Sequence, residues 1–361
     1  MSLPCVLLRV RSKATIAALR PHGGNAVAAF RMLSSAAKAA KPDMALIREL
    51  REASGAPIVD CKNALAAEGV DGNIGLAFQW LRKRGIAKAT SMADRSANEG
   101  LIGLLVDGSR GALVEVNSET DFVARNARFQ DFVGKVLAVA LEKAAGAPQD
   151  DGRGASRALD VEELLRAEQP ESGEVLADSL AHLVGAIREN ISVSRAQVVS
   201  LGHGQGVVTG YVHGAVGPGM GKNAALVALS FDPATEAKHG DDAREALEAG
   251  GRSLAMHVVA ARPAFLDEAS APEGALEKEK KILLDQARES GKDPKILGRM
   301  VEGRMRKYFE DNALVRQSHM VAEGNPRVGD YLRDLGEGVG GTVTLKGFAR
   351  LSVGEREGNF E

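Results

Sequence analysis

The sequence predicts an α+β fold in which a small helical bundle precedes a core that is built twice from the same order of elements. Three observations support this prediction. Apolar residues of positions 43–85 recur at helical spacing, short strand-like stretches begin after position 98, and the order of hairpin, helix and closing strand occurs twice. We therefore expect a pseudo-duplicated core of two small antiparallel sheets with flanking helices.

Residues 1–41 have the composition of a targeting segment. They carry seven Lys and Arg side chains, and no Asp or Glu precedes Asp43. Arg-rich, acid-free sequence with abundant Ala and Ser is typical of a mitochondrial transit peptide, with a plastid transit peptide as the alternative. Arg31–Ser35 looks like a processing site. We expect this segment, disordered or helical, to direct import into the mitochondrial matrix.

The remaining composition argues against several classes of protein. Without the seven basic residues of the first segment, 39 basic residues stand against 48 acidic ones, so the mature chain is acidic and unsuited to nucleic acid. Charged residues and glycines interrupt every apolar stretch before the roughly 20 residues needed to span a membrane. Cys5 and Cys61 are too few for a disulfide framework, and no zinc spacing is present. We expect no membrane, metal or cofactor.

Residues 42–86 read as three short amphipathic helices. The first ends near Gly55, the second begins at Pro57, and the third ends before Gly85. Three such helices in so short a segment predict a bundle like the ubiquitin-associated (UBA) fold. The polar residues 87–98 are expected to form a linker. The aligned apolar residues are Leu46, Ile47 and Leu50, then Ile58, Cys61 and Leu65, then Ile74, Phe78 and Leu81.

Residues 99–206 form the first copy of the core. Leu101–Val106 and Ala112–Val116 flank the turn signal Asp107-Gly108-Ser109, which predicts a hairpin. After the hairpin we expect, in order, a helix with Phe129 to Leu141 on its apolar face, a flexible insertion at 146–157, more helix at 161–189 and a closing strand at 191–201.

Residues 207–272 and 311–361 repeat this order. The expected elements are strands at 207–215 and 224–231, a helix at 243–261 and a closing strand at 343–353. Residues 273–310 interrupt the copy as an antiparallel helical hairpin, in the manner of a short coiled coil. Its expected facing residues are Leu276, Leu283 and Ala287 on one helix and Ile296, Met300 and Met305 on the other.

Signals of an enzyme are weak. In Gly217–Asn223 a phosphate loop would need a glycine at Val216 and a hydroxyl residue at Asn223. Gly202–Gly206 has the wrong spacing for a dinucleotide site, and the chain has no Gly-x-Ser-x-Gly elbow. An enzyme that uses His257 or His213 remains as a rival hypothesis, but we expect no catalytic residues.

The segment from Glu115 to Asn126 lies where a predicted strand ends and a predicted helix begins. Thr120 suits a helix cap, and the helix dipole favours Asp121 at the helix start. Phe122 precedes Phe129 by seven residues, so periodicity alone favours a place for Phe122 at the top of the buried stripe. The other interpretation is that Phe122 faces a partner.

Four stretches, spread from Asp43 to Glu355, resemble the elongation factor Ts family. The resemblance implies an exchange factor without catalytic chemistry, which binds elongation factor Tu with GDP and promotes its replacement by GTP. The stretches are Gly55–Lys62, Thr120–Val123 after Glu-Val-Asn, Ala255–Val258 with Pro263, and Met300–Met305.

The resemblance also implies site residues. Four residues of the strand-to-helix segment would enter between helices of the partner's GTPase domain and displace its Mg²⁺ ion, which loosens the nucleotide site. His257 would otherwise be a buried core histidine. The first group is Asp121, Phe122, Val123 and Ala124, and the further partner contacts are Thr120, His257, Ile187, Met320 and Val321.

Two further expectations follow from the resemblance. The small bundle would dock on the GTPase domain, although a general adaptor that recognises ubiquitin-like tails is the alternative. The chain ends soon after its last strand, so the C-terminal helix of bacterial members is missing, which suggests an organellar variant.

Overall fold

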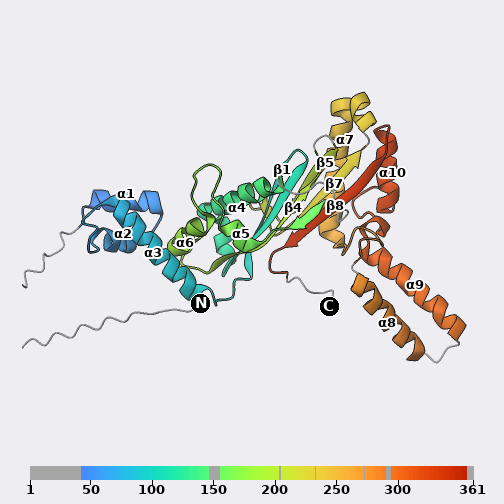
Figure 1. Ribbon diagram of the computed structural model, residues 1–361, viewed down its shortest axis with the longest axis horizontal. Helices are drawn as coiled ribbons and strands as arrows, with labels where there is room; N and C mark the ends of the chain where they lie inside the picture. Colours follow the sequence, from blue (N-terminus) through green and yellow to red (C-terminus); the bar gives the residue numbers. More distant parts are fainter. Residues whose placement is uncertain are drawn as a thin grey trace, which may run out of the picture.

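The computed structural model describes residues 42–145, 155–202, 205–231, 233–271, 273–289 and 294–355. The predicted transit peptide and residues 146–154 of the predicted insertion lie outside these ranges. The chain forms a helical bundle, a core with two antiparallel sheets and a helical hairpin, which confirms the predicted α+β class (Figure 1). Within the described ranges, no helix is long and apolar enough to cross a membrane.

The bundle consists of α1 (Met44–Ser54), α2 (Ile58–Leu65) and α3 (Ile74–Met92). Asp43 and Asn73 cap the first and third helices with their side-chain oxygens, as short polar residues at this position commonly do. Gly55 ends α1 in the left-handed conformation, with φ of 69°. Ile58, predicted to align with Cys61 and Leu65 on the apolar face, is 48% exposed. The buried interior comprises Ile47, Leu50, Ala56, Cys61, Ala64, Leu65, Val70 and Ala77.

The third helix does not end at Gly85, as predicted, but continues to Met92. Gly85 lies against the backbone of α6 (Leu176–Ile187), where an added Cβ would meet the Ala181 carbonyl oxygen at 2.6 Å. The glycine therefore allows close packing between helices instead of ending one. As a result, the segment without helical structure before the core begins only at Ala93.

The first sheet has the strand order β3-β4-β2-β1-β6. The predicted hairpin is present: Asp107 pairs with Arg110 across a two-residue turn in which Gly108 has φ of 58°. Part of the predicted insertion is a short strand, β3. The elements of this half are β1 (Glu99–Asp107), β2 (Arg110–Ser118), α4 (Ala127–Ala145), β3 (Ser156–Ala158), α5 (Val161–Leu165), α6 and β4 (Ile191–Ser200).

The second sheet has the order β5-β7-β8. Its helix α7 starts at Pro233, ten residues before the predicted start, and a further helix, α10, was not predicted. The apolar residues Val328, Leu332 and Leu335 of α10 have helical spacing that could have revealed it. The elements are β5 (Gly206–His213), β7 (Asn223–Phe231), α7 (Pro233–Ala261), α10 (Val328–Gly338) and β8 (Val343–Ser352).

The two sheets pack face to face, and helices cover their outer faces (Figure 1). Helices α4 and α6 bury one apolar cluster against the first sheet, and α7 and α10 bury another against the second. Between the sheets lie residues such as Ile102, Leu113, Leu226 and Leu351. At Gly111 the sheets approach so closely that a Cβ would meet the Leu226 side chain at 2.8 Å.

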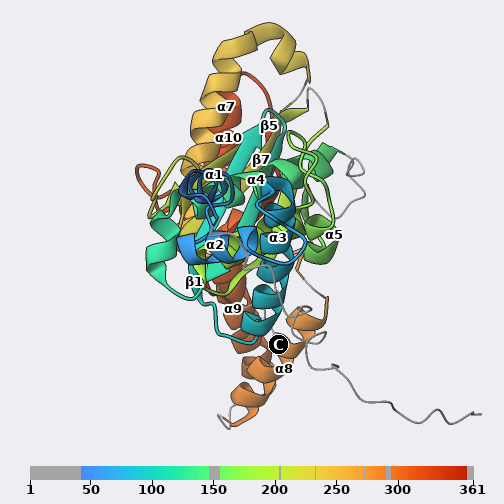
Figure 2. The ribbon, with the colours of Figure 1, turned by 90° about the vertical axis from the view of Figure 1, so that its left-hand side faces the viewer.

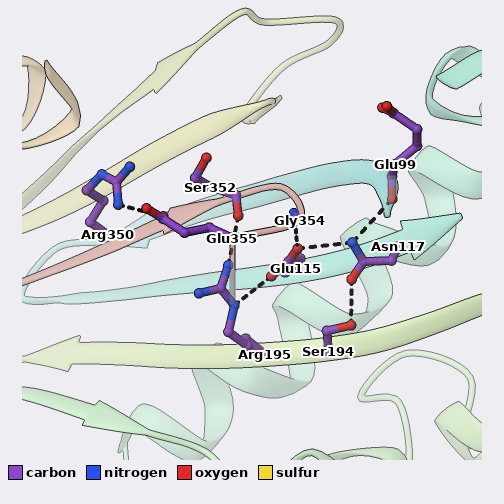
Figure 3. A network of polar contacts seen from close by, with 9 residues as sticks. All are labelled: Glu99, Glu115, Asn117, Ser194, Arg195, Arg350, Ser352, Gly354 and Glu355. Atoms are coloured by element: carbon purple, nitrogen blue, oxygen red, sulfur yellow. Dashed lines mark hydrogen bonds and ion pairs between the residues drawn. The ribbon is translucent and has the colours of Figure 1, made fainter. Parts of the chain in front are cut away.

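The two halves of the core also exchange contacts along their edges. Strand β6 (Met220–Gly221) belongs to the connection between β5 and β7, yet it pairs with β1 of the first sheet. In return, the chain after β8 reaches the first sheet, where the Gly354 N–H donates to Glu115 (2.8 Å) and Arg195 donates to the Ser352 carbonyl (2.7 Å) (Figure 3). The predicted loop at 217–222 is thus partly a strand of the other half.

The predicted helical hairpin is formed by α8 (Glu273–Glu289) and α9 (Pro294–Asn312). Leu283 and Val301 are its buried residues, with Leu284, Leu297 and Met305 beside them, so Leu283 and Met305 face each other's helix as expected and Val301 was missed. The side chains of Ala287 and Ile296 lie outside the described residues. In both views, the hairpin and α7 extend to opposite sides of the core (Figures 1 and 2).

Candidate functional site

A short 3-10 turn, Asp121–Arg125, follows β2 and is called the Phe122 turn below. Asn126 is extended, with φ of −75° and ψ of 124°, and it separates the turn from α4. Its side-chain oxygen accepts the Arg128 N–H at 2.9 Å, which caps the start of α4. Because of this break, the buried stripe of α4 begins at Phe129 and does not continue back to Phe122.

The side chain of Phe122 is 81% exposed, the highest value among the exposed large apolar side chains of the described residues. The prediction from periodicity, that Phe122 tops the core stripe, is therefore wrong. Asp121 beside it is exposed as well. A large aromatic side chain that is exposed in the free chain marks a candidate contact with another molecule.

Val123 and Ala124 point the other way. Both are buried in the apolar cluster that also holds Phe129 and Phe132, so neither side chain is exposed on the surface where the resemblance implies partner contacts. Gln130 of α4 donates its side-chain N–H to the Ala124 carbonyl at 2.9 Å. These contacts attach the Phe122 turn to the core directly behind the exposed ring.

Two carboxylates hold the chain just before the turn. Glu189 accepts the Thr120 N–H at 3.0 Å and the Thr120 hydroxyl at 2.7 Å, while Glu119 accepts the Asn190 N–H at 2.7 Å. We call this reciprocal pair of contacts the carboxylate clasp. Thr120 occupies the N-cap position of the turn, but its hydroxyl binds Glu189 and makes no capping hydrogen bond. Sequence reasoning assigned no role to Glu119, Glu189 or Asn190, although the polar run after an apolar helix could have drawn attention to the last two.

The residue before the clasp, Arg188, connects the core to the bundle. Its guanidinium donates to Asp60 of α2 at 2.9 Å, and Lys88 of α3 donates to the same carboxylate at 3.2 Å. Burial raises the pKa of Asp60, but the hydrogen bonds and charges of Arg188 and Lys88 outweigh it, so the net pKa lies below its ordinary value. Asp60 therefore stays ionised between the bundle and the core.

Ile187, the last residue of α6, is half-buried at the edge of the cluster formed by the first sheet and its helices. Ile187 directly precedes Arg188 in the sequence, and Glu189 and Asn190 of the carboxylate clasp follow. The structure thus brings the expected contact residues Thr120, Phe122 and Ile187 into one part of the molecule, while His257, Met320 and Val321 belong to the other half of the core.

A second exposed apolar pair is formed by Met320 and Val321, at 61% and 47% exposure. Two buried histidines hold the backbone of this loop. His257 Nδ1 accepts the Met320 N–H at 3.2 Å, and His319 Nδ1 accepts the N–H groups of Val321 and Ala322 at 3.2 and 3.0 Å. His257 itself is fully buried, so it supports this surface from behind and does not reach it.

Both histidines have environments that favour the neutral ring. Burial lowers the pKa of His257, although its contact with Gln317 at 3.0 Å acts in the opposite direction. Burial, with a smaller contribution from His257, lowers the pKa of His319 to about 4. A neutral ring leaves Nδ1 free to accept the backbone N–H groups. His319 was not singled out from the sequence.

These surfaces can bind, but their geometry offers little for catalysis. The Thr120 hydroxyl is engaged by Glu189, and His213 is an exposed residue whose ring nitrogen lies 3.3 Å from the Tyr211 hydroxyl. Among the residues that the structure describes, no group of three or more His, Cys, Asp or Glu side chains could hold a metal ion.

Comparison with known proteins identifies a family. Residues 119–355 match the model of the family described as elongation factor TS. The chain is 43% identical to elongation factor Ts of Paramagnetospirillum magneticum over 310 residues, which cover 86% of this chain and 90% of the relative. It is 41% identical to elongation factor Ts of Rhodospirillum centenum over 311 residues, which cover 86% of this chain and 92% of the relative. It is 43% identical to elongation factor Ts of Gluconobacter oxydans over 311 residues, which cover 86% of this chain and 91% of the relative.

Proposed function

Because the chain belongs to the elongation factor Ts family, whose known function is nucleotide exchange on elongation factor Tu, we propose that it performs this exchange through Phe122. The observation that carries the proposal is the exposed aromatic ring on a turn whose backbone is attached to the core on both sides. No chemistry of its own is required.

The ring acts by entering between helices of the partner's GTPase domain. Large aromatic side chains that become fully buried on binding contribute most of the energy of an interface. Movement of the partner's helices disturbs the Mg²⁺ ion and the phosphate loop that hold GDP, so the nucleotide leaves without any bond being broken. In this step the chain contributes only non-covalent contacts, made by the ring and the surface around it.

Binding of the two ligands to the partner is reciprocal. If this chain weakens the binding of GDP by some factor, GDP weakens the binding of this chain by the same factor. The complex with both ligands is therefore short-lived. Typical coupling between two sites is about 1–3 kcal/mol, and release of a tightly held nucleotide requires several times more. A buried aromatic ring together with displacement of an ion can supply it.

The other surfaces extend the contact. Met320 and Val321 are exposed on a loop held by His257 and His319, which supports their role as partner contacts. The three-helix bundle resembles the UBA fold, and its exposed Ile58 and Val59 lie within the stretch that resembles the family, which supports docking on the GTPase domain.

The organellar assignment is part of the proposal. It is supported by the first 41 residues, with their seven basic side chains and no acidic one, which suit import into mitochondria better than into plastids. Fusion of residues 1–41 to a fluorescent protein tests it: delivery to mitochondria is expected, and a fusion that stays outside them would refute it.

The test of the main proposal is Phe122→Ala. Release of a fluorescent GDP from elongation factor Tu is followed after mixing with excess unlabelled nucleotide. Loss of an aromatic hot-spot side chain commonly costs about 2–4 kcal/mol, so release should slow about 100-fold. Because the ring is exposed, thermal unfolding should be unchanged.

Leu105→Ala is the matched control, since Leu105 is also exposed in the first half of the core. It should accelerate GDP release as the wild type does. Unchanged release with Phe122→Ala would refute the role of the ring.

Turnover of GTP by the pure chain alone would favour the rival enzyme that uses His213 or His257. Deletion of residues 43–85 should weaken partner binding, and complete loss would favour the adaptor.

A further inference from the structure

Three consecutive residues between α6 and β4 contact three different parts of the molecule. The Arg188 guanidinium binds Asp60 of the bundle, Glu189 binds Thr120 before the Phe122 turn, and the Asn190 side chain donates to the Arg95 carbonyl between the bundle and the core, at 2.7 Å.

The backbone conformation makes this divergence possible. Helix α6 ends with Arg188 in the left-handed region, at φ of 66° and ψ of 28°. Glycine usually occupies such a position, and another residue there is stabilised by the contacts around it. The change of direction lets the Arg188 side chain reach α2 while Glu189 reaches Thr120.

Glu189 acts on the residues that carry the exposed ring. Its carboxylate accepts both the N–H and the hydroxyl of Thr120, two positions before Phe122. On the other side of the ring, Val123 is buried and Gln130 binds the Ala124 carbonyl. The backbone of Phe122 is therefore held from both sides, which reduces the conformational entropy lost when the ring is buried in a partner.

Arg188 acts on the bundle. Asp60 is buried between α2, α3 and the end of α6, where it binds both Lys88 and Arg188. The bundle is also held by the ion pair of Arg82 with Asp178 and by the close approach of Gly85 to Ala181. Loss of Arg188 alone should loosen the bundle without releasing it.

We infer that Arg188, Glu189 and Asn190 form a positioning segment that holds the Phe122 turn and the N-terminal bundle in one relative arrangement. Glu189 sets the position of the exposed ring, and Arg188 sets that of the bundle. This inference rests on the proposed function, since both elements are proposed to meet the same partner. The three residues act through others and need not touch the partner.

Glu189→Ala tests the effect on the ring. The rate of GDP release from elongation factor Tu is measured at increasing concentrations of this chain. Two hydrogen bonds to a charged group are lost, so the maximal rate should fall about tenfold, while the half-saturating concentration stays within about twofold. Glu189→Gln, which retains one acceptor, should restore part of the rate. The control Glu163→Ala removes an exposed ion pair with Lys143 and should change neither value.

The same substitution in the Phe122→Ala background separates positioning from general damage. If Glu189 acts through the ring, its removal has no further effect once the ring is absent. A tenfold loss in both backgrounds would overturn the inference, as would an unchanged maximal rate with Glu189→Ala alone.

Arg188→Met tests the effect on the bundle. It should raise the half-saturating concentration about fivefold and leave the maximal rate within about twofold. The opposite pattern, a lower maximal rate at unchanged half-saturation, would overturn the assignment of Arg188 to the bundle.

Hydrogen exchange of the free chain distinguishes this inference from the proposed function. In Glu189→Ala, the amides of residues 119–126 should exchange about tenfold faster, while those of α1 to α3 are unchanged. If wild-type chain failed to accelerate GDP release, the proposed function would be refuted whatever the exchange shows. If it did accelerate release but the amides of 119–126 were unaffected by Glu189→Ala, only the positioning role would be refuted.

Discussion

Replacement of Arg195 by Met should destabilise the core strongly, because it leaves a buried carboxylate without its cation. Arg195 Nε lies 2.6 Å from Glu115 Oε2, and the two side chains are only 15% and 3% exposed. Glu115 Oε1 also accepts from Asn117 at 3.0 Å and from the Gly354 N–H at 2.8 Å, as Figure 3 shows. The substitution removes the bond to Oε2 and the donor to the Ser352 carbonyl.

The magnitude follows from the burial of the pair. Breaking a buried ion pair on one side typically costs about 3–5 kcal/mol, since the remaining charge is desolvated without compensation. With a urea dependence of about 2–3 kcal/mol per molar, the midpoint of unfolding should fall by roughly 1–2.5 M. Glu115→Gln combined with Arg195→Met should recover part of the loss, because no charge is then left buried.

Urea unfolding at 25 °C, followed by circular dichroism, measures these changes. The control is Arg166→Met, which breaks an exposed ion pair with Glu162 within one helical turn and should cost less than about 0.5 kcal/mol. If Arg195→Met shifted the midpoint no more than Arg166→Met does, this network would not stabilise the contact between the two halves.

Two further predictions concern the histidine pair and the bundle. His319 has a folded-state pKa of about 4, below the 6.5 of a free side chain. Between these two pH values the unfolded chain therefore binds more protons than the folded chain. The free energy of unfolding should consequently fall as the pH drops from 6.5 to 4, by up to about 3 kcal/mol. His319→Asn, which does not titrate, should flatten this dependence in urea unfolding at several pH values, and an equally steep profile would contradict it. Gly85→Ala should separate α3 from α6, since its Cβ would lie 2.6 Å from the Ala181 carbonyl, and hydrogen exchange of α3 should become faster. Slower exchange would show that helix propensity outweighs this contact, as Ala is favoured over Gly by about 1 kcal/mol.

Local signals predicted the elements that depend on local geometry. The Asp107-Gly108-Ser109 turn identified the first hairpin because a two-residue turn needs a residue that adopts positive φ. Gly55 likewise marked the end of α1. The recurrence of hairpin and helix in both halves was sufficient to predict two small antiparallel sheets.

The differences arise where distant residues decide the local structure. Gly85 is followed by more helix because its missing side chain makes room for α6, a contact that no local pattern reveals. Strand β6 exists because β1 of the other half offers it a free edge. Both cases are tertiary effects that outweigh a local preference.

The sequence indicated which residues belong to the candidate site, but not which of their side chains are exposed, buried or hydrogen-bonded. The resemblance drew attention to Thr120–Ala124, and the structure then divides these residues into one exposed ring, two buried anchors and a hydroxyl bound by Glu189. The extended Asn126 decides this division, since it ends the turn before α4 begins. His319 was missed because its partners are backbone N–H groups, which leave no trace in the sequence.

The pairing of β6 with β1 and the attachment of Gly354 to Glu115 have a mechanical consequence. Each half of the core contributes a piece of chain to the other, so the halves cannot swing apart unless hydrogen bonds on both edges break. A force applied at the exposed ring is therefore resisted by the whole core. If the ring docks on a partner as proposed, these two attachments make a movement between the halves an unfavourable way to relieve the resulting strain, so we expect more of it to be relieved in the partner.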